Sequence, residues 1–238
     1  MLKQNNKRIL GVVGGLGPLA SAEFLKTIYE YSLHEREQDS PIVIMYSDPT
    51  FPDRTEQFLQ GSYGVLLELL AESLQRLSQL RVSRIVICCM TIHHLLPKLP
   101  AELRAPVISL LDVIYARVLQ TRQRHLLVCT NGTRQLELFE RHEQWESVRD
   151  YIVLPVEKDQ QMIHHDILYQ VKKNGDMGKL TARLEGLVEK YEVSSFIAGC
   201  TETHLLAKQF ARSNGHGKRY VCVDPLTIIA QQIAQEWI

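Results

Sequence analysis

Short apolar runs alternate with longer amphipathic segments along almost all of this 238-residue chain. RILGVV at 8–13 and RIVIC at 84–88 are two such runs, and a segment with apolar residues at helical spacing follows each. A short apolar run bounded by turn residues indicates a buried strand, and strands that alternate with helices are typical of parallel sheets covered by helices. The sequence therefore predicts an α/β protein.

The predicted elements fall into two series of similar length. Strands are expected at 8–13, 41–47, 84–88 and 107–110, and then at 125–129, 151–155, 195–198 and 220–223. Helices are expected from Pro18, over 65–80, from 91, over 113–121, from about 134 to 145, over 159–173, 180–191 and 201–210, and from 225 to the end. The two series predict two α/β lobes, each a parallel sheet flanked by helices.

An internal repeat links the two series. VSRIVICCMTIHHL at 82–95 aligns without gaps with VSSFIAGCTETHLL at 193–206, at an offset of 111 residues. Cys89 matches Cys200, and His93 matches His204. Two parallel strands can look alike by chance, but a cysteine, a histidine and a flanking serine that recur in register favour an ancestral duplication. The two lobes are therefore expected to be pseudo-symmetric.

Each repeat places a cysteine at the carboxyl end of a strand, where ligands bind in open α/β sheets. The start of the following helix offers backbone N–H groups and a favourable dipole, which stabilise a thiolate. Cys89 and Cys200 are expected to face each other across an interlobe cleft. A thiolate on one face of a substrate carbon and a thiol on the other could remove and return a proton, which inverts a stereocentre.

Charge and cysteine usage narrow the function class. The chain has 27 Lys and Arg residues in total and 27 Asp and Glu residues in total. It therefore lacks the overall basic charge that nucleic-acid binders usually carry. No run approaches the roughly 20 apolar residues that span a bilayer. The five cysteines lie in or just after apolar runs, which is typical of reduced thiols and not of a secreted disulfide framework. We expect a cytoplasmic protein with a small-molecule substrate and no nucleic-acid or membrane partner.

Six short motifs together resemble the aspartate/glutamate racemase superfamily of cofactor-independent two-cysteine racemases, in particular its aspartate racemase branch. The resemblance covers nearly the whole chain. The matching segments are GGLGPLA at 14–20, DPTFPDRT at 48–55, CMTIH at 89–93, TNGT at 130–133, GCTE at 199–202 and VDP at 223–225.

The resemblance implies a role for individual residues. Cys89 and Cys200 fall on the paired acid/base cysteines, and Arg54 falls on an arginine that grips a substrate side-chain carboxylate with its planar fork. The positions implied to line the ligand site are Gly15, Leu16, Met90, Thr91, Thr130, Thr133 and Thr201. The resemblance also implies a homodimer without pyridoxal phosphate and a C-terminal helix that returns to the first lobe. The lobes are then 1–98 with 208–238, and 99–207. From the residue spacing we expect no metal at the site.

Two positions depart from the family pattern. Met90 stands where the family has an asparagine, and a thioether cannot replace the hydrogen bonds of an amide. The segment 162–167 carries His164, His165 and Asp166 where the family often has a Lys or Arg that helps to hold a carboxylate. The nearest lysine is Lys158. Both departures affect the choice of substrate more than the type of reaction.

Several other residues have structural interpretations. Cys88 should point to the opposite face of its strand from Cys89, into packing. Cys129 and Cys222 are expected to be small buried residues. Glu202 is interpreted as a hydrogen-bonding support near a helix start, and Asp53 as a residue that holds the loop around Arg54.

Four alternative functions remain open. GLGPLA at 15–20 fits a loose dinucleotide-binding pattern, although Pro18 removes an N–H that a pyrophosphate would use. Cys89, His93, Cys200 and His204 could in principle hold zinc. Maleate isomerases of the same superfamily keep both cysteines. Met90 could also mark a catalytically silent member that binds an amino acid as a sensor.

Overall fold

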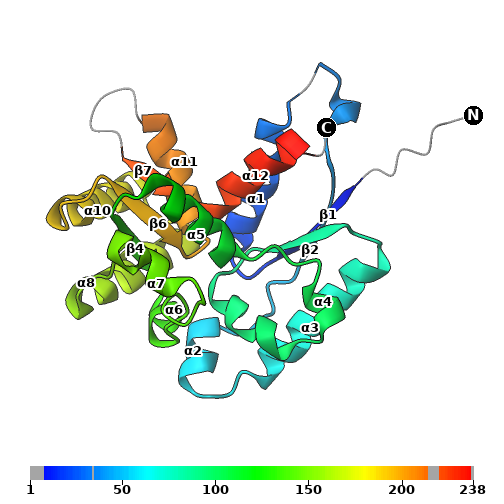
Figure 1. The fold of residues 1–238 in the computed structure, drawn as a ribbon, viewed down its shortest axis with the longest axis horizontal. Helices are drawn as coiled ribbons and strands as arrows, with labels where there is room; N and C mark the ends of the chain where they lie inside the picture. Colours follow the sequence, from blue (N-terminus) through cyan, green and yellow to red (C-terminus); the bar gives the residue numbers. More distant parts are fainter. Residues whose placement is uncertain (1–7, 34, 214–219, 237–238) are drawn as a thin grey trace, which may run out of the picture.

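The computed structural model describes residues 8–33, 35–213 and 220–236 and contains two parallel β-sheets (Figure 1). The first sheet has the strand order β2-β1-β3, and the second has the order β5-β4-β6-β7. The strands are β1 (Ile9–Gly14), β2 (Ile42–Ser47), β3 (Arg84–Ile87), β4 (His125–Cys129), β5 (Ile152–Val153), β6 (Ser195–Gly199) and β7 (Val221–Val223). The predicted α/β fold with two parallel sheets flanked by helices is confirmed.

Helices connect these strands. In the first half they are α1 (Pro18–Tyr31), η1 (Glu37–Asp39), α2 (Arg54–Leu59), α3 (Gly64–Gln79), η2 (Thr91–Lys98), α4 (Ala101–Arg104) and α5 (Leu110–Thr121). In the second they are α6 (Asn131–Gln135), α7 (Trp145–Val148), η3 (Arg149–Tyr151), α8 (Glu157–Met162), η4 (Ile163–Leu168), α9 (Tyr169–Lys172), α10 (Met177–Lys190), α11 (Thr203–Ser213) and α12 (Pro225–Glu236). None of these described helices is long and apolar enough to cross a bilayer.

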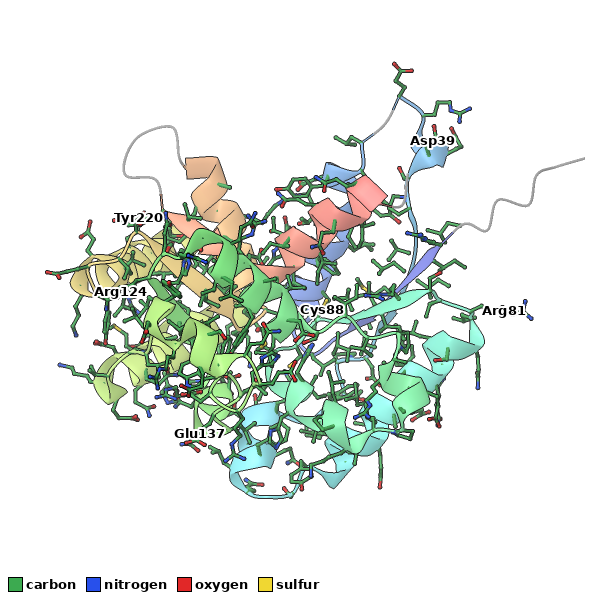
Figure 2. All side chains as sticks on the ribbon, in the orientation of Figure 1. Asp39, Arg81, Cys88, Arg124, Glu137 and Tyr220 are labelled. Carbon is green, nitrogen blue, oxygen red and sulfur yellow. The ribbon has the colours of Figure 1, made fainter. Side chains whose placement is uncertain are left out.

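One face of each sheet packs into a shared central core, which includes apolar residues of α1, α5 and α12. Successive residues of a strand point to opposite faces, so Val86 and Cys88 enter the central core while Ile87 and Cys89 pack on the side of α3. The predicted inward orientation of Cys88 is therefore confirmed. Figure 2 shows Cys88 near the middle of the molecule, where the two halves meet.

The outer face of each sheet has its own helical cover. In the first sheet α3 supplies Leu66, Leu70 and Leu74, which pack against Ile85 and Ile87 of β3. In the second sheet the outer core combines β4 and β6 with η4, α10 and α11. Cys200 lies in that second outer core, so the two cysteines occupy corresponding positions in the two halves.

Three predicted elements differ from the structure. Segment 107–110 forms only an isolated bridge, Ile85 to Val107, because Ser109 accepts a hydrogen bond from the Asp112 backbone N–H and begins α5. The helix expected to reach 145 stops at Gln135, and Glu137 adopts a left-handed backbone with φ 49°, which ends a helix. The helix expected over 159–173 contains a π-helical stretch, η4.

The C-terminal segment contacts both halves. β7 pairs with β6 in the second sheet, although the predicted boundary gives all of 208–238 to the first lobe. α12 lies along α1 and also contacts α5 (Figure 1). β7 thus extends the second sheet, while α12 joins the central core. The predicted lobe boundaries, 1–98 with 208–238 and 99–207, stay a prediction.

Candidate active site

Cys89 and Cys200 line the same small pocket, at the carboxyl ends of β3 and β6. The other predicted site residues that line it are Leu16, Arg54, Met90, Thr91, Thr130 and Thr201. The pocket has a volume of about 10 Å³, enough for about one water molecule. Both cysteines are nearly buried, with exposed fractions of 6% and 5%. The structure therefore brings together, around one point, chemical groups that lie more than 100 residues apart in sequence.

Three threonine hydroxyl groups form a cluster on one wall. Thr91 Oγ1 lies 2.8 Å from Thr133 Oγ1 and 3.3 Å from Thr130 Oγ1. Thr130 caps α6 by accepting a hydrogen bond from the Thr133 backbone N–H at 3.3 Å. Thr133 does not line the pocket itself but supports the two threonines that do. Thr201 donates to the Cys88 carbonyl at 3.2 Å, which ties the second cysteine turn to the first.

Arg54 begins α2 and lies beside Cys89. Its amino groups donate to the backbone carbonyls of Leu16 at 2.7 Å and Pro52 at 3.1 Å. Burial alone would lower the pKa of Arg54, but its electrostatic interactions with Cys89, Asp53 and Glu202 outweigh burial and raise that pKa. Arg54 thus carries a permanent positive charge at Cys89, and it braces two loops in addition to any contact with a ligand.

Cys200 has the opposite electrostatic environment. Its thiol donates to Glu202 Oε2, with an Sγ–Oε2 distance of 2.9 Å. Burial, and next the negative charge of Glu202, raise the pKa of Cys200 well above its usual range. The interpretation of Glu202 as a hydrogen-bonding support agrees with this contact. Cys200 is therefore a thiol at neutral pH, with a carboxylate as its immediate partner.

Glu202 is itself buried, with an exposed fraction of 3%. Its Oε1 has no hydrogen-bond partner among the residues that the structure describes. Gly17 lies against this carboxylate, and a Cβ atom at Gly17 would overlap Oε1. The glycine thus makes room for the acid at the start of α1.

The two repeat histidines hold the cysteine turns in place. His93 Nδ1 donates to the Cys89 carbonyl at 2.8 Å, and its Nε2 accepts from the Leu110 backbone N–H at 3.3 Å. Burial lowers the pKa of His93 to about 4, so the ring is neutral. His204 Nδ1 donates to Asp224 Oδ2 at 2.6 Å. These contacts occupy the nitrogens that the zinc alternative would use, and the described residues contain no group of three His, Cys, Asp or Glu that could hold a metal.

Lys172 also lines the pocket, and no motif in the sequence indicated it. It comes from α9, and its Nζ lies 3.7 Å from Asp53 Oδ2 and 4.2 Å from the Tyr169 ring centroid. Segment 162–167 carries no Lys or Arg, as the sequence shows, but the lysine that lines the pocket is Lys172 and not Lys158. The extra residue of a π-helical turn rotates every later side chain about the helix axis, so the position of Lys172 depends on η4, which periodicity does not reveal.

His164 does not supply the missing charge. Burial, and then the positive charge of neighbouring groups, lower its pKa to about 4, so its ring is neutral. Its Nδ1 accepts a hydrogen bond from the Asn131 backbone N–H at 3.3 Å. His164 therefore has a structural role beneath α6.

Asp53 connects the two halves of the site. Its Oδ1 caps α2 by accepting from the Glu56 N–H at 3.1 Å, as expected for a residue that holds the Arg54 loop. Its Oδ2 accepts from the Tyr169 hydroxyl of α9 at 2.8 Å. Burial alone would raise its pKa, but these hydrogen bonds and the charges of Lys172 and Arg54 lower it. The Arg54 loop is therefore fastened to the second half of the chain by an ionised carboxylate.

Comparison with known proteins adds an independent finding. The sequence model of the family described as Asp/Glu/Hydantoin racemase matches residues 13–233. The chain is also similar to the solved structure of an aspartate racemase from Picrophilus torridus, with a TM-score of 0.77 and 20% identity over 96% of this chain and 94% of the other.

Two further structures share the fold. A glutamate racemase from Francisella tularensis, in complex with D-glutamate, gives a TM-score of 0.61 and 17% identity over 97% of this chain and 81% of the other. An allantoin racemase from Klebsiella pneumoniae gives a TM-score of 0.52 and 15% identity over 96% and 86%. At such identities the structures show the fold alone, and the three proteins are named for three different substrates.

Proposed function

Because the chain belongs to the Asp/Glu/hydantoin racemase family, we propose that it is a racemase that inverts the α-carbon of an amino acid between Cys89 and Cys200. Family membership supports a racemase-type isomerase, and the substrate and the roles of the cysteines are the proposal. The observation that carries it is that both cysteines line one pocket at the carboxyl ends of corresponding strands.

The proposed step uses the opposite charges beside the two sulfurs. The Cys89 thiolate, next to Arg54, takes the α-proton and forms an S–H bond. The electron pair of the broken Cα–H bond moves into the substrate carboxylate, which becomes enolate-like. Cys200 then donates its proton to the other face and becomes a thiolate. Two positioned acid–base groups of this kind each contribute about 10²–10⁴-fold to a rate.

The developing negative charge needs partners, and the pocket offers them without a cofactor. Arg54 and Lys172 are cations that line it, and the hydroxyl groups of Thr91 and Thr130 line it as hydrogen-bond donors. Preorganised donors and charges in a buried site stabilise such an anion more strongly than water does. The substrate carboxylate itself therefore serves as the electron sink.

The remaining expectations belong to the same proposal. All five cysteines are free thiols, which fits a reducing compartment and hence a cytoplasmic enzyme of amino-acid metabolism. The proposal also includes a small-molecule substrate and assembly as a homodimer. Maleate isomerase activity and binding without turnover are the two competing functions.

Solvent deuterium exchange tests the function without knowledge of the product. We expect the protein, in D₂O with a panel of single-enantiomer amino acids, to introduce deuterium at Cα of at least one of them, as measured by mass spectrometry. Exchange occurs because the thiol that returns the proton equilibrates with solvent. Conversion of maleate to fumarate without exchange would instead identify the isomerase, and a thermal shift with an amino acid but no exchange would identify a silent binder.

Replacing Glu202 by glutamine should change the pH dependence of the reaction. The Glu202 carboxylate disfavours an anion at Cys200, so an uncharged amide should lower the pKa of that thiol. Cys200 must be a thiol to donate, so the alkaline limb of the initial rate in that direction should move to lower pH. Initial rates across a pH series, followed by optical rotation, measure the shift. If the alkaline limb does not move, the pairing of Glu202 with Cys200 is contradicted. If the rate is lower at every pH without such a shift, Glu202 has a structural role only.

A further inference from the structure

A second cavity adjoins the cysteine pocket and reaches the surface. This cavity, here called the chamber, is formed by parts of the segments 15–20, 49–54, 171–172 and 202–205. Its volume is about 260 Å³, enough for several water molecules. Pro18, Leu19 and Pro49 line the chamber and are exposed, so solvent reaches its wall. The cysteine pocket has room for only about one water molecule, so the chamber is the side from which solvent approaches the site.

Glu202 bridges the two cavities. Its Oε2 accepts the hydrogen bond from Cys200, which lines the cysteine pocket and not the chamber. Its Oε1 lies against Gly17, which lines the chamber and not the cysteine pocket. Oε1 is buried and has no hydrogen-bond partner among the described residues. One carboxyl group thus has an oxygen on the sulfur and a second oxygen at the chamber wall.

The other ionisable residues that line both cavities are Asp53, Arg54 and Lys172, and their contacts do not suit proton transfer to a sulfur. Arg54 lies beside Cys89, but a guanidinium group does not lose its proton in proteins. Both oxygens of Asp53 accept hydrogen bonds from groups other than a thiol, and Lys172 lies 3.7 Å from Asp53. Among the described residues, Glu202 is therefore the acid that joins a proposed catalytic sulfur to the chamber.

We propose that Glu202 is a proton relay that restores the Cys200 thiol from solvent after each inversion. The inference rests on the proposed racemase function, in which Cys200 gives its proton to the substrate and becomes a thiolate beside the Glu202 carboxylate. Two adjacent anions repel each other, so the pair takes up a proton readily. The relay supplies the route by which that proton arrives.

The proton moves in two steps. A hydronium ion in the chamber transfers a proton to Oε1 of Glu202 and becomes water. A half-turn about the Cγ–Cδ bond brings the new O–H group to Cys200, where the O–H bond breaks as the S–H bond forms, and its electron pair returns to the carboxylate. In the opposite direction of racemisation, the same steps run backwards and release the proton that Cys200 has taken from the substrate.

The burial of Cys200 makes such a route necessary. The exposed fraction of Cys200 is 5%, so bulk water has little direct access to its sulfur. Burial, and next the negative charge of Glu202, raise the pKa of this thiol, so the thiolate left after proton donation is a strong base. The return of the proton is therefore favourable, and the relay determines how fast it occurs.

The kinetics of Glu202→Gln test the relay, with the amino acid that exchanges fastest in the deuterium panel as substrate. Glutamine keeps the shape of the side chain but cannot pass a proton between water and sulfur. We expect kcat to fall at least about tenfold, and to fall more than kcat/KM, because the relay acts after the product has left. Imidazole carries a proton near neutral pH and is small enough for the chamber, so it should raise kcat of this variant in proportion to its concentration. Optical rotation at constant ionic strength measures these rates.

Three comparisons distinguish a relay from a structural role. The wild-type kcat should not depend on imidazole, and a wild-type kcat that rises with imidazole would contradict the relay. Bis-tris propane, a bulky amine buffer of similar pKa, should restore Glu202→Gln much less than imidazole does. Asp53→Asn is the matched control, because Asp53 also lines both cavities but makes its hydrogen bonds to other groups. Imidazole should not raise kcat of Asp53→Asn, whatever its initial activity.

Gly17→Ala provides an independent variant. A Cβ atom at Gly17 would overlap Oε1, so it should displace the carboxyl group while the acid itself remains. Its kcat should also fall and recover with imidazole, and urea unfolding shows whether each variant is folded. If racemisation persists but neither folded variant responds to imidazole, the relay is wrong and the racemase proposal stands. If the wild-type chain exchanges no amino acid, the racemase proposal fails and the relay fails with it.

Discussion

Cys89→Ala and Cys200→Ala are each expected to lower the rate of racemisation by at least about 10³-fold in both directions. Inversion needs a base on one face and an acid on the other, so the loss of either sulfur stops the complete reaction. Conversion of each pure enantiomer, followed by circular dichroism, measures the effect. Neither change removes much volume, so urea unfolding should show native-like stability.

Other cysteines provide the matched control. Cys222→Ala removes a thiol that lies outside the cysteine pocket and should retain nearly full activity. Cys88 cannot replace its neighbour, because burial raises its pKa and keeps it a thiol that points into the central core. Retention of more than a tenth of the wild-type rate in either Cys89→Ala or Cys200→Ala would rule out the two-base mechanism.

Gly15→Ala is expected to destabilise the fold by about 3–5 kcal/mol. Gly15 has a φ of 87°, in the left-handed region that favours glycine, and a Cβ atom there would overlap the backbone of Asp48. The neighbouring atoms belong to main chain, so they cannot move aside as a flexible side chain would. The midpoint and slope of urea unfolding give the free energy.

Gly61→Ala separates the two contributions to this cost. Gly61 has a comparable φ of 68°, but nothing lies within 4 Å of the position of its Cβ. Its replacement should therefore cost only about 1–2 kcal/mol for the backbone conformation. Equal losses in the two variants would show that contact with Asp48 contributes nothing.

The strands were the most predictable part of the fold. A strand covered on both faces reads as a continuous apolar run, and the period of two was enough to turn Cys88 away from Cys89. Helix ends were less predictable. Ser109 begins α5 where an apolar run suggested a longer strand, and the left-handed backbone of Glu137 follows the early end of α6. These helix boundaries are set by local capping contacts. Such contacts involve only a few residues, whereas hydrophobic periodicity is an average over a longer segment and does not detect them.

The site was predictable where the repeat and the motifs fell on strand ends, and not where a long-range contact placed a residue. Lys172 lines the pocket and follows the π-helical turn η4, which shifts the helical phase before it and which the apolar periodicity did not predict. The contact between Glu202 and Cys200 could be predicted, because the two residues are only two positions apart. The positive charge of Arg54 beside Cys89 could not be predicted in this way, because Arg54 belongs to a loop from another part of the chain. The chamber, a larger cavity of about 260 Å³ that shares residues with this pocket, was likewise not predictable, because four separate segments build its wall.

The central core draws on both sheets, and this bears on how such a chain arose. If the repeat records a duplication, one ancestral half on its own would have exposed to water the sheet face that now packs against α5 and α12. Such a half would have needed a second copy to cover that face. The duplication would then have fused two subunits that already met there, and the pair of sulfurs would descend from one cysteine repeated across a dimer axis.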